Sequence, residues 1–368
     1  MASGPELAGG ALMASVRTTG PARAATPARP RARWGDDLIA TLLATWVVGG
    51  LFLDGWAHVN RPGLETFFST WHGVFYAGFA AGTLHVARLV RRHQRGRFDP
   101  GLVPAGYGLG LVGVGLFVAG AVADGTWHTL FGVEAGVAAL LSPSHLLLLA
   151  GGLLMLTSPL RSAWSSPGLR ASSPPAALLP ALWATTLTTA VVLFFLQYLS
   201  AFVSLAPTVP DAPAGGTPFQ LVTTSVGVAG VLVTNLVLLA PVLLLARRWR
   251  LPFGTVTLIA TTGALLVTAL REFTLGALVP AMLAGGLASD LLVARLRPAP
   301  HRPGALRAVA TVVPLLLWGA WLAAYALAYG VAWRPELWAG VVVMAMLSGL
   351  GLSVLVLPPR VPATAWED

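Results

Sequence analysis

Long apolar stretches alternate with short polar segments along almost the whole chain. A membrane-spanning helix needs about 20 largely apolar residues, and about ten stretches meet this requirement. The pattern therefore predicts an all-α polytopic integral membrane protein with about ten transmembrane helices. The predicted spans are centred on residues 36–57, 66–87, 102–123, 143–160, 176–203, 219–246, 253–270, 275–294, 307–330 and 338–357.

The composition agrees with a membrane protein. The chain has 368 residues, of which 56% are hydrophobic and only 10% are charged, whereas a soluble domain carries roughly a quarter charged residues. This excludes an ordinary soluble enzyme and a disordered chain. The sequence contains no cysteine, which excludes disulfides, thiolate zinc sites, iron–sulfur clusters and cysteine nucleophiles.

The positions of the arginines predict the topology. The net charge of +9 includes 23 basic residues, and all of them are Arg. When alternate connections are assigned to opposite sides, 20 arginines fall on one side, while Arg61, Arg271 and Arg334 fall on the other. The positive-inside rule then places both termini in the cytoplasm of a multi-pass protein in the plasma (inner) membrane. The expected partners are the lipid bilayer and other membrane subunits or further copies of the chain, with no nucleic acid.

The predicted helices fall into two groups. Residues 34–165 form a four-helix half and residues 176–357 a six-helix half, with a Pro/Gly-rich outer loop at 205–218. Residues 1–33 are rich in Arg, Pro and Ala and lack the continuous apolar core of a cleaved signal. We expect them to form a disordered cytoplasmic tail, and residues 358–368 to form a second one.

The four-helix half contains a repeat of about 70 residues. Its first and third helices both end in Asp-Gly-x-x-His, and each is followed by a Glu and then by a His that opens the next helix. This predicts two helical hairpins related by an axis along the membrane normal. The repeated positions are Asp54, His58, Glu65 and His72 in the first copy, and Asp124, His128, Glu134 and His145 in the second.

The repeated side chains are expected in one layer near the outer membrane face. His72 lies 16 residues before Arg88, which is about 24 Å along a helix in a hydrocarbon core about 30 Å thick. An Asp and a His at i, i+4 share a helical face, and the His of the next helix completes an Asp/His/His set. The predicted metal ligands are Asp54, His58 and His72, and Asp124, His128 and His145, with Glu65, Glu134 and Trp127 expected to support them.

Three interpretations of this layer stay open. Nitrogen and oxygen ligands without sulfur suit copper(II), zinc, iron(II) or manganese, and histidines alone also hold copper(I). Four histidines at one depth also allow bis-histidine haem ligation, although the two aspartates are then unexplained. Finally, Asp and His near helix ends can pair with each other in headgroup water and cap the hairpins.

The second copy of the repeat is similar to a motif of a known family. Asp124-Gly-Thr-Trp127-His128, followed by Ser142-Pro143-Ser144-His145, resembles a hallmark of the C subunit of copper membrane monooxygenases, which oxidise methane, ammonia or short hydrocarbons. The resemblance covers the first four helices. It implies copper held by the Asp and both His near the outer face, and a second, similar set whose spacing matches the first copy here.

The six-helix half offers fewer candidates. Arg271 and Glu272 either reach the metal layer or mark the membrane edge, and the second reading is favoured. Gln197 and Tyr198 are placed to hydrogen-bond groups in the layer, and Asp290 is an intramembrane acid close to the cytoplasmic side. In the four-helix half, His85 is expected at the cytoplasmic interface.

Two functions follow from these patterns. The first is a copper-binding, monooxygenase-like oxidoreductase, or a subunit of one, that acts on a small lipophilic substrate. The second is a copper or zinc transporter or metal-handling protein, so whether the chain is an enzyme is left open. A hydrophobic cavity that leads to the metal layer supports the enzyme, whereas a polar track towards Asp290 supports transport.

Overall fold

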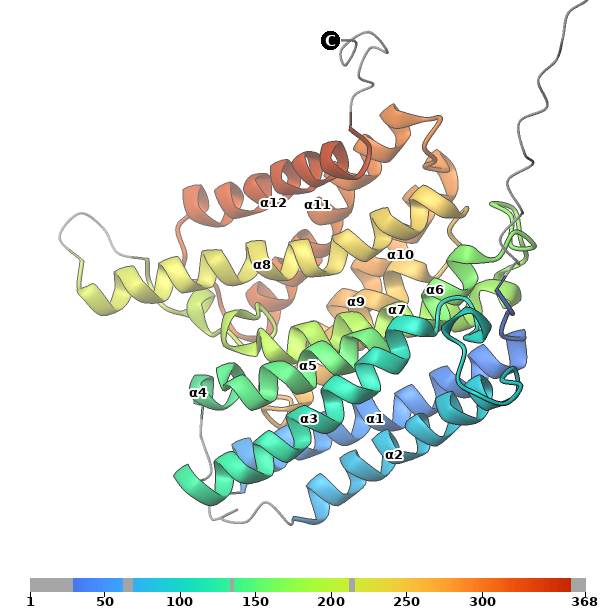
Figure 1. The fold of residues 1–368 in the computed structure, drawn as a ribbon. Helices are drawn as coiled ribbons and strands as arrows, with labels where there is room; N and C mark the ends of the chain where they lie inside the picture. The colour runs from blue at the N-terminus through green and yellow to red at the C-terminus, as the bar shows by residue number, and fades with distance from the viewer. Residues whose placement is uncertain (1–28, 62–68, 133–135, 212–215, 359–368) are drawn as a thin grey trace, which may run out of the picture.

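The computed structural model describes residues 29–61, 69–132, 136–211 and 216–358. These residues form a bundle of helices, and no β-strand occurs among them (Figure 1). The α-helices are α1 (Trp34–Asn60), α2 (Thr70–Arg91), α3 (Gly108–Phe131), α4 (Gly136–Leu141), α5 (Pro143–Leu156), α6 (Ser158–Ser165), α7 (Pro175–Phe195), α8 (Pro218–Arg248), α9 (Thr255–Ala269), α10 (Leu278–Leu296), α11 (Pro303–Ala328) and α12 (Pro335–Val356).

The described helices confirm an all-α polytopic membrane protein. Nine helical segments in the described ranges are long and apolar enough to cross a membrane, with α5 and α6 counted together as one span. The predicted span at 253–270 is α9, which has only 15 residues. Helix α9 begins after Pro252 and after Gly254, which is in a left-handed conformation, and it ends at Ala269, where a turn follows.

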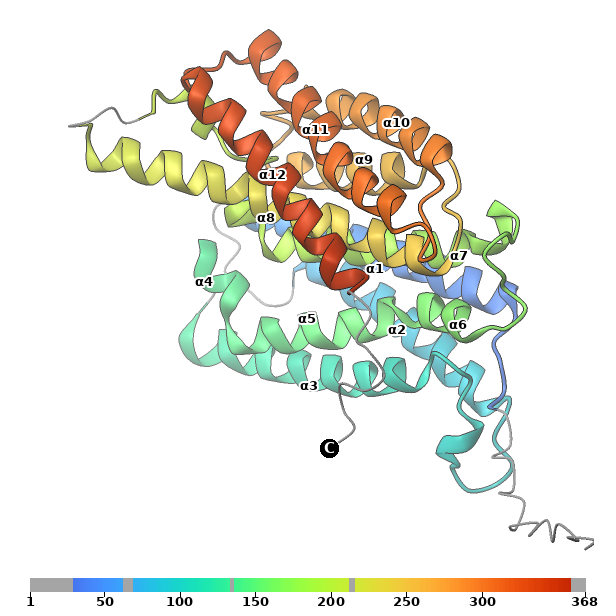
Figure 2. The same ribbon diagram turned by 90° about the horizontal axis from the view of Figure 1, so that it is seen from above.

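Helix α7 joins the two predicted halves. In the four-helix half, α1 packs along α2, and α3 packs along α5. Helix α7 contacts α1, α5, α6 and α9, so it lies between these pairs and the other half (Figures 1 and 2). The largest buried apolar cluster includes Val48 and Phe52 of α1 together with side chains of α7 to α12. The two halves therefore share one core.

Small residues allow the paired helices to approach closely. A Cβ atom on Gly151 of α5 would lie 2.6 Å from the backbone nitrogen of Phe117 on α3, and 2.7 Å from the carbonyl oxygen of Gly113. Distances this short leave no room for a side chain, so α3 and α5 are in backbone contact. Packing between small residues is a main source of helix association in membranes.

A buried polar cluster fixes the end of the four-helix half where α1 begins. Asp37 of α1 accepts hydrogen bonds from the Tyr107 hydroxyl at 2.6 Å and from Ser162 of α6 at 2.9 Å, while Asp36 pairs with Arg92 at 2.8 Å. Burial raises the pKa of Tyr107 above its usual range, and the Asp37 carboxylate raises it further. The phenol therefore stays protonated and donates to Asp37.

Candidate metal centre

The Asp and His side chains of the repeat lie at the opposite end of the four-helix half. Asp54 and His58 occupy the last turns of α1, and Ser69 caps the next helix, α2, by accepting a hydrogen bond from the backbone nitrogen of His72 at 3.1 Å. The Ser69 hydroxyl also lies 2.9 Å from His72 Nδ1. The helix cap thus fixes both the start of α2 and the orientation of its histidine.

The second hairpin repeats this arrangement. Asp124 and His128 lie near the end of α3, and Ser142 caps α5 through the backbone nitrogen of His145 at 3.4 Å. The Ser142 hydroxyl lies 2.8 Å from His145 Nδ1. A Ser three residues before the His is thus shared by both copies. This spacing of Ser and His is present in the sequence, but the pattern of predicted metal ligands does not reveal that the serines cap helices and contact the histidines.

The second group has the geometry of a three-ligand metal site. Nε2 of His128 and Nε2 of His145 lie 3.5 Å and 3.3 Å from Oδ1 of Asp124. Ligand atoms about 2.0–2.1 Å from a tetrahedral metal lie about 3.3 Å apart, which matches both distances. Each ring is also fixed through Nδ1, which lies 3.3 Å from the Gly132 carbonyl oxygen in His128 and beside Ser142 in His145. Such contacts orient the nitrogen that faces the metal.

The first group is arranged less regularly. His72 Nδ1 lies 3.2 Å and His58 Nδ1 3.8 Å from Asp54 Oδ1, and His58 Nδ1 also bonds to the Asp54 carbonyl oxygen at 2.9 Å. The two rings lie edge to face with centroids 5.3 Å apart. One ligand atom from each of the three residues still lies within 4.8 Å of the others, as in the second group. Both groups can hold a metal ion.

The burial of the aspartates is consistent with a bound cation. Asp124 is only 1% exposed, and its Oδ1 accepts a hydrogen bond from Ser144 at 3.1 Å. Its buried Oδ2, like Oδ1 of Asp54, forms no hydrogen bond with any described residue. A carboxylate charge with an unpaired oxygen is costly to bury, and a metal ion between the Asp and the two His would offset this cost.

One cavity connects the two groups. It has a volume of about 840 Å³ and is lined by all six predicted ligands. Its remaining lining is mostly aliphatic and aromatic. A volume of this size accommodates an organic ligand. The apolar lining residues include Leu51, Phe75, Phe117, Leu148, Phe194 and Phe195.

The six-helix half contributes three polar residues to this cavity, namely Gln197, Tyr198 and Arg271. The predicted span 176–203 is shorter in the structure, because α7 ends at Phe195 and a 3-10 turn follows over Gln197–Leu199. This turn brings Gln197 and Tyr198 to the cavity wall. The sequence favours a position at the membrane edge for Arg271, but Arg271 also lines the cavity, because α9 is short and the chain turns back towards α1.

The three supporting residues predicted beside the ligands have different outcomes. Glu65 and Glu134 lie outside the described residues. Trp127 packs against Phe131 on the same helix, with ring centroids 4.7 Å apart, so its role beside the ligands stays a prediction.

Asp290 has a structural role in this fold. It is 1% exposed and accepts hydrogen bonds from the backbone nitrogens of Val256 and Thr257, each at 3.0 Å, and from the Thr257 hydroxyl at 2.6 Å. Asp290 of α10 therefore caps the start of α9, in place of a residue of α9 itself. These bonds account for its burial without an ion pathway.

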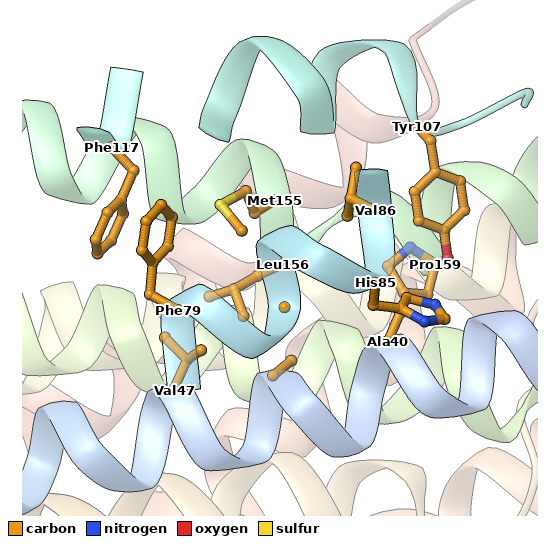
Figure 3. Close-up of a pocket in the computed structure, with 13 residues that line it drawn as sticks. Ala40, Val47, Phe79, His85, Val86, Tyr107, Phe117, Met155, Leu156 and Pro159 are labelled. Atoms are coloured by element: carbon orange, nitrogen blue, oxygen red, sulfur yellow. The ribbon is translucent and has the colours of Figure 1, made fainter. Parts of the chain in front are cut away.

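A smaller cavity of about 40 Å³ lies between α1, α2, α3 and α5. Figure 3 shows His85 and Tyr107 at one end of it and Phe79 and Phe117 at the other. His85, expected at the membrane interface, is half-buried, and its Nε2 bonds to the Asp36 carbonyl oxygen at 3.0 Å. Phe117 lines both this cavity and the large one.

The fold and the site together define a polytopic helical membrane protein with two Asp/His/His groups that can hold metal ions in one cavity. No protein-family model matches the chain, and no curated protein or solved structure is detectably similar to it. The functional argument therefore depends on the geometry of the site.

Proposed function

We propose that the protein is a copper-dependent membrane oxidoreductase of monooxygenase type, or a subunit of one, that acts on a lipophilic substrate. The observation that carries this proposal is the placement of two matching Asp/His/His groups in one cavity with apolar walls. A pure transport site needs no apolar chamber of about 840 Å³ beside the metal. An oxidoreductase that takes its substrate from the bilayer needs such a chamber.

The ligand set favours a small ion over haem. The Asp124 carboxylate oxygen lies within 3.5 Å of both imidazole nitrogens, where a porphyrin between two histidines would have to fit. Imidazole and carboxylate ligands suit both copper and zinc. The resemblance of the second copy to the C subunit of copper membrane monooxygenases supports copper, and it makes a partner subunit or a second copy of the chain an expected part of the active assembly.

Copper in these groups would supply activation of dioxygen. The residues around the metal groups have different roles. Ser69 and Ser142 hold the histidine rings in place, and Asp54 and Asp124 supply negative charge. Phe117 and Phe194 belong to the apolar wall that receives the substrate and excludes water.

Transport of copper or zinc is the second candidate. It is favoured by the small cavity next to His85, because Phe117 lines both this cavity and the large one. It is opposed by Asp290, whose hydrogen bonds to α9 account for its burial without a polar track. Uptake of copper-64 or zinc-65 into proteoliposomes separates the two functions, because the oxidoreductase is expected to bind metal without moving it across the membrane.

Elemental analysis of the purified protein tests the proposal directly. We expect one to two copper ions per chain in detergent-purified wild type. The double variants His128→Ala/His145→Ala and His58→Ala/His72→Ala are each expected to lose one site. His301→Ala, outside both groups, serves as the matched control and keeps its metal. Size-exclusion profiles check folding, and a well-folded wild type that binds no metal in copper-supplemented medium would overturn the proposal.

A further inference from the structure

Two arginines from different halves of the chain line the cavity of the metal groups. They are Arg61, which follows α1, and Arg271, which follows α9. Within the described ranges, neither guanidinium forms an ion pair with a carboxylate. Arg334, the third arginine predicted on this side, instead bonds to Asp211 with an Nε–Oδ2 distance of 2.8 Å, and this bond holds the pKa of Asp211 below its usual value.

The loop that carries Arg271 is attached to the end of α1. The Asn60 side-chain amide donates to the Leu270 carbonyl oxygen at 2.9 Å and to the Trp56 carbonyl oxygen at 2.8 Å. Gly55 makes this approach feasible, because a Cβ atom there would lie 2.4 Å from the Phe194 ring and 3.4 Å from Leu270. Arg271 is thus held beside the helix that bears Asp54 and His58.

The backbone after Arg271 is unusual. Glu272 and Phe273 both have positive φ angles, of 50° and 57°, a conformation that residues other than glycine rarely adopt. Two such residues in succession persist only where the surroundings fix the turn. Here the Phe273 nitrogen bonds back to the Thr268 carbonyl oxygen at 3.0 Å. The turn therefore sets the direction in which Arg271 leaves the helix.

Arg61 is also positioned by its neighbours. Its guanidinium carbon lies 5.2 Å from the ring centroid of Trp56, within the range of a cation–π contact, and the Trp56 ring packs edge-on against Trp71 at 5.9 Å. Arg61 and Arg271 are both exposed, so the end of the cavity that they line is its mouth, and this mouth carries two oriented cationic groups.

Below this mouth the cavity becomes apolar. Phe117 lies seven residues before Asp124 on α3, and Leu156 lies eleven residues after His145 at the end of α5. At 1.5 Å per residue these positions are about 10 Å and 16 Å deeper than the metal groups. The cavity thus combines a cationic entrance, a layer of metal ligands and a long apolar interior.

We propose that the ligand of this cavity is an anionic amphiphile, with a carboxylate or phosphate head bound by Arg61 and Arg271 and a single hydrocarbon chain in the apolar interior. This names the substrate class of the proposed oxidoreductase and so rests on the proposed function. The argument is one of charge complementarity, because guanidinium groups bind carboxylates and phosphates in a bidentate manner. Asp54 and Asp124 line the same cavity and balance the two arginines in charge, so divalent ions at the two Asp/His/His groups would make the lining positive overall.

Binding of radiolabelled dodecanoate to the detergent-purified protein tests this inference. We expect saturable binding that weakens at least tenfold in Arg271→Gln and in Arg61→Gln, with partial recovery in Arg271→Lys. Arg334→Gln is the matched control and binds like wild type, because that arginine pairs with Asp211 outside the cavity. Dodecyl phosphate should compete with dodecanoate. Dodecanol should not, because it lacks the negative charge, and acetate and inorganic phosphate should not, because they lack the hydrocarbon chain.

Other results would overturn the inference. Equal binding of dodecanol and dodecanoate would show that charge is not recognised, and competition by acetate or inorganic phosphate alone would show a site for free anions. Competition by phosphatidylglycerol but not by dodecyl phosphate would assign the arginines to bilayer headgroups. Metal content is measured on the same samples. If the protein contains the expected metal but Arg271→Gln does not change dodecanoate binding, only this inference is refuted. If the protein contains no metal but Arg271→Gln clearly weakens dodecanoate binding, only the proposed function is refuted.

Discussion

At the scale of single residues, two serine caps position one histidine in each of the groups that can hold a metal ion. Ser69 and Ser142 each bind the nitrogen of a helix start and the imidazole of the same histidine. Residues that orient metal ligands in this way typically contribute 10- to 100-fold to metal affinity. The caps therefore link local helix formation to the chemistry of the site.

We expect Ser142→Ala to weaken metal binding at the second group about 10- to 100-fold, because Ser142 holds Nδ1 of His145 while Nε2 faces Asp124. Ser69→Ala is expected to act only on the first group, where Ser69 contacts the nitrogen of His72 that itself faces Asp54. Each variant loses the hydroxyl that fixes one histidine, while the three ligand side chains remain. Chelator competition titrations measure the two affinities, and each variant serves as the control for the other. Equal loss at both groups in either variant would contradict this assignment.

At the scale of helices, the second group depends on the backbone contact between α3 and α5. His145 of α5 reaches Asp124 of α3 only because Gly113 and Gly151 let the two helices touch. The first group depends in the same way on α1 and α2, where a Cβ on Gly50 would lie 2.8 Å from the Phe75 Cα atom. Helix spacing thus contributes directly to the distances between the predicted ligands.

Gly151→Val should therefore separate α3 from α5 and abolish metal binding at the second group while the first group keeps its ion. Overpacking of this kind costs about 1–3 kcal/mol, so the thermal unfolding temperature is also expected to fall. Gly115→Val on α3 is the matched control, because no atom lies within 4 Å of its Cβ position. Metal content per folded chain and thermal unfolding in detergent are the measurements. Equal effects of the two variants would argue against helix spacing as the cause.

At the scale of the whole molecule, the bundle has two chemically different ends. One end of the four-helix half holds the Asp/His/His groups, and the other holds the cluster of Asp37, Tyr107 and Ser162. The distribution of arginines predicts that the metal groups face outwards. An outward position would let the site take metal and amphiphilic substrate directly from the outer leaflet.

The lack of cysteine in the sequence makes this orientation simple to test. Thr274→Cys, in the turn after Arg271, is expected to react with a membrane-impermeant maleimide in right-side-out vesicles. Ser172→Cys, between α6 and α7, is expected to react only after permeabilisation. The reverse pattern would place the metal groups on the cytoplasmic side.

The sequence by itself determined the fold class, the approximate spans and the six residues of the two Asp/His/His groups. It did so because a bilayer demands long apolar helices and because a repeat of about 70 residues places matched side chains at matched depths. Helix ends were less predictable, because hydrophobicity marks an apolar stretch but not the residue at which the chain turns. Thus α7 ends at Phe195 and α9 has only 15 residues.

Only the tertiary structure decided which residues surround the six predicted ligands. Arg271 and Gln197 reach the cavity from distant parts of the chain, through the contacts of α7 and of the Leu270 turn with α1. The sequence marks Asp290 only as an intramembrane acid, and its structural role comes from its hydrogen bonds to the start of α9. Spacing within one helix follows from its 3.6-residue period. Contacts between helices far apart in sequence depend on how all of them pack, and no local pattern encodes that.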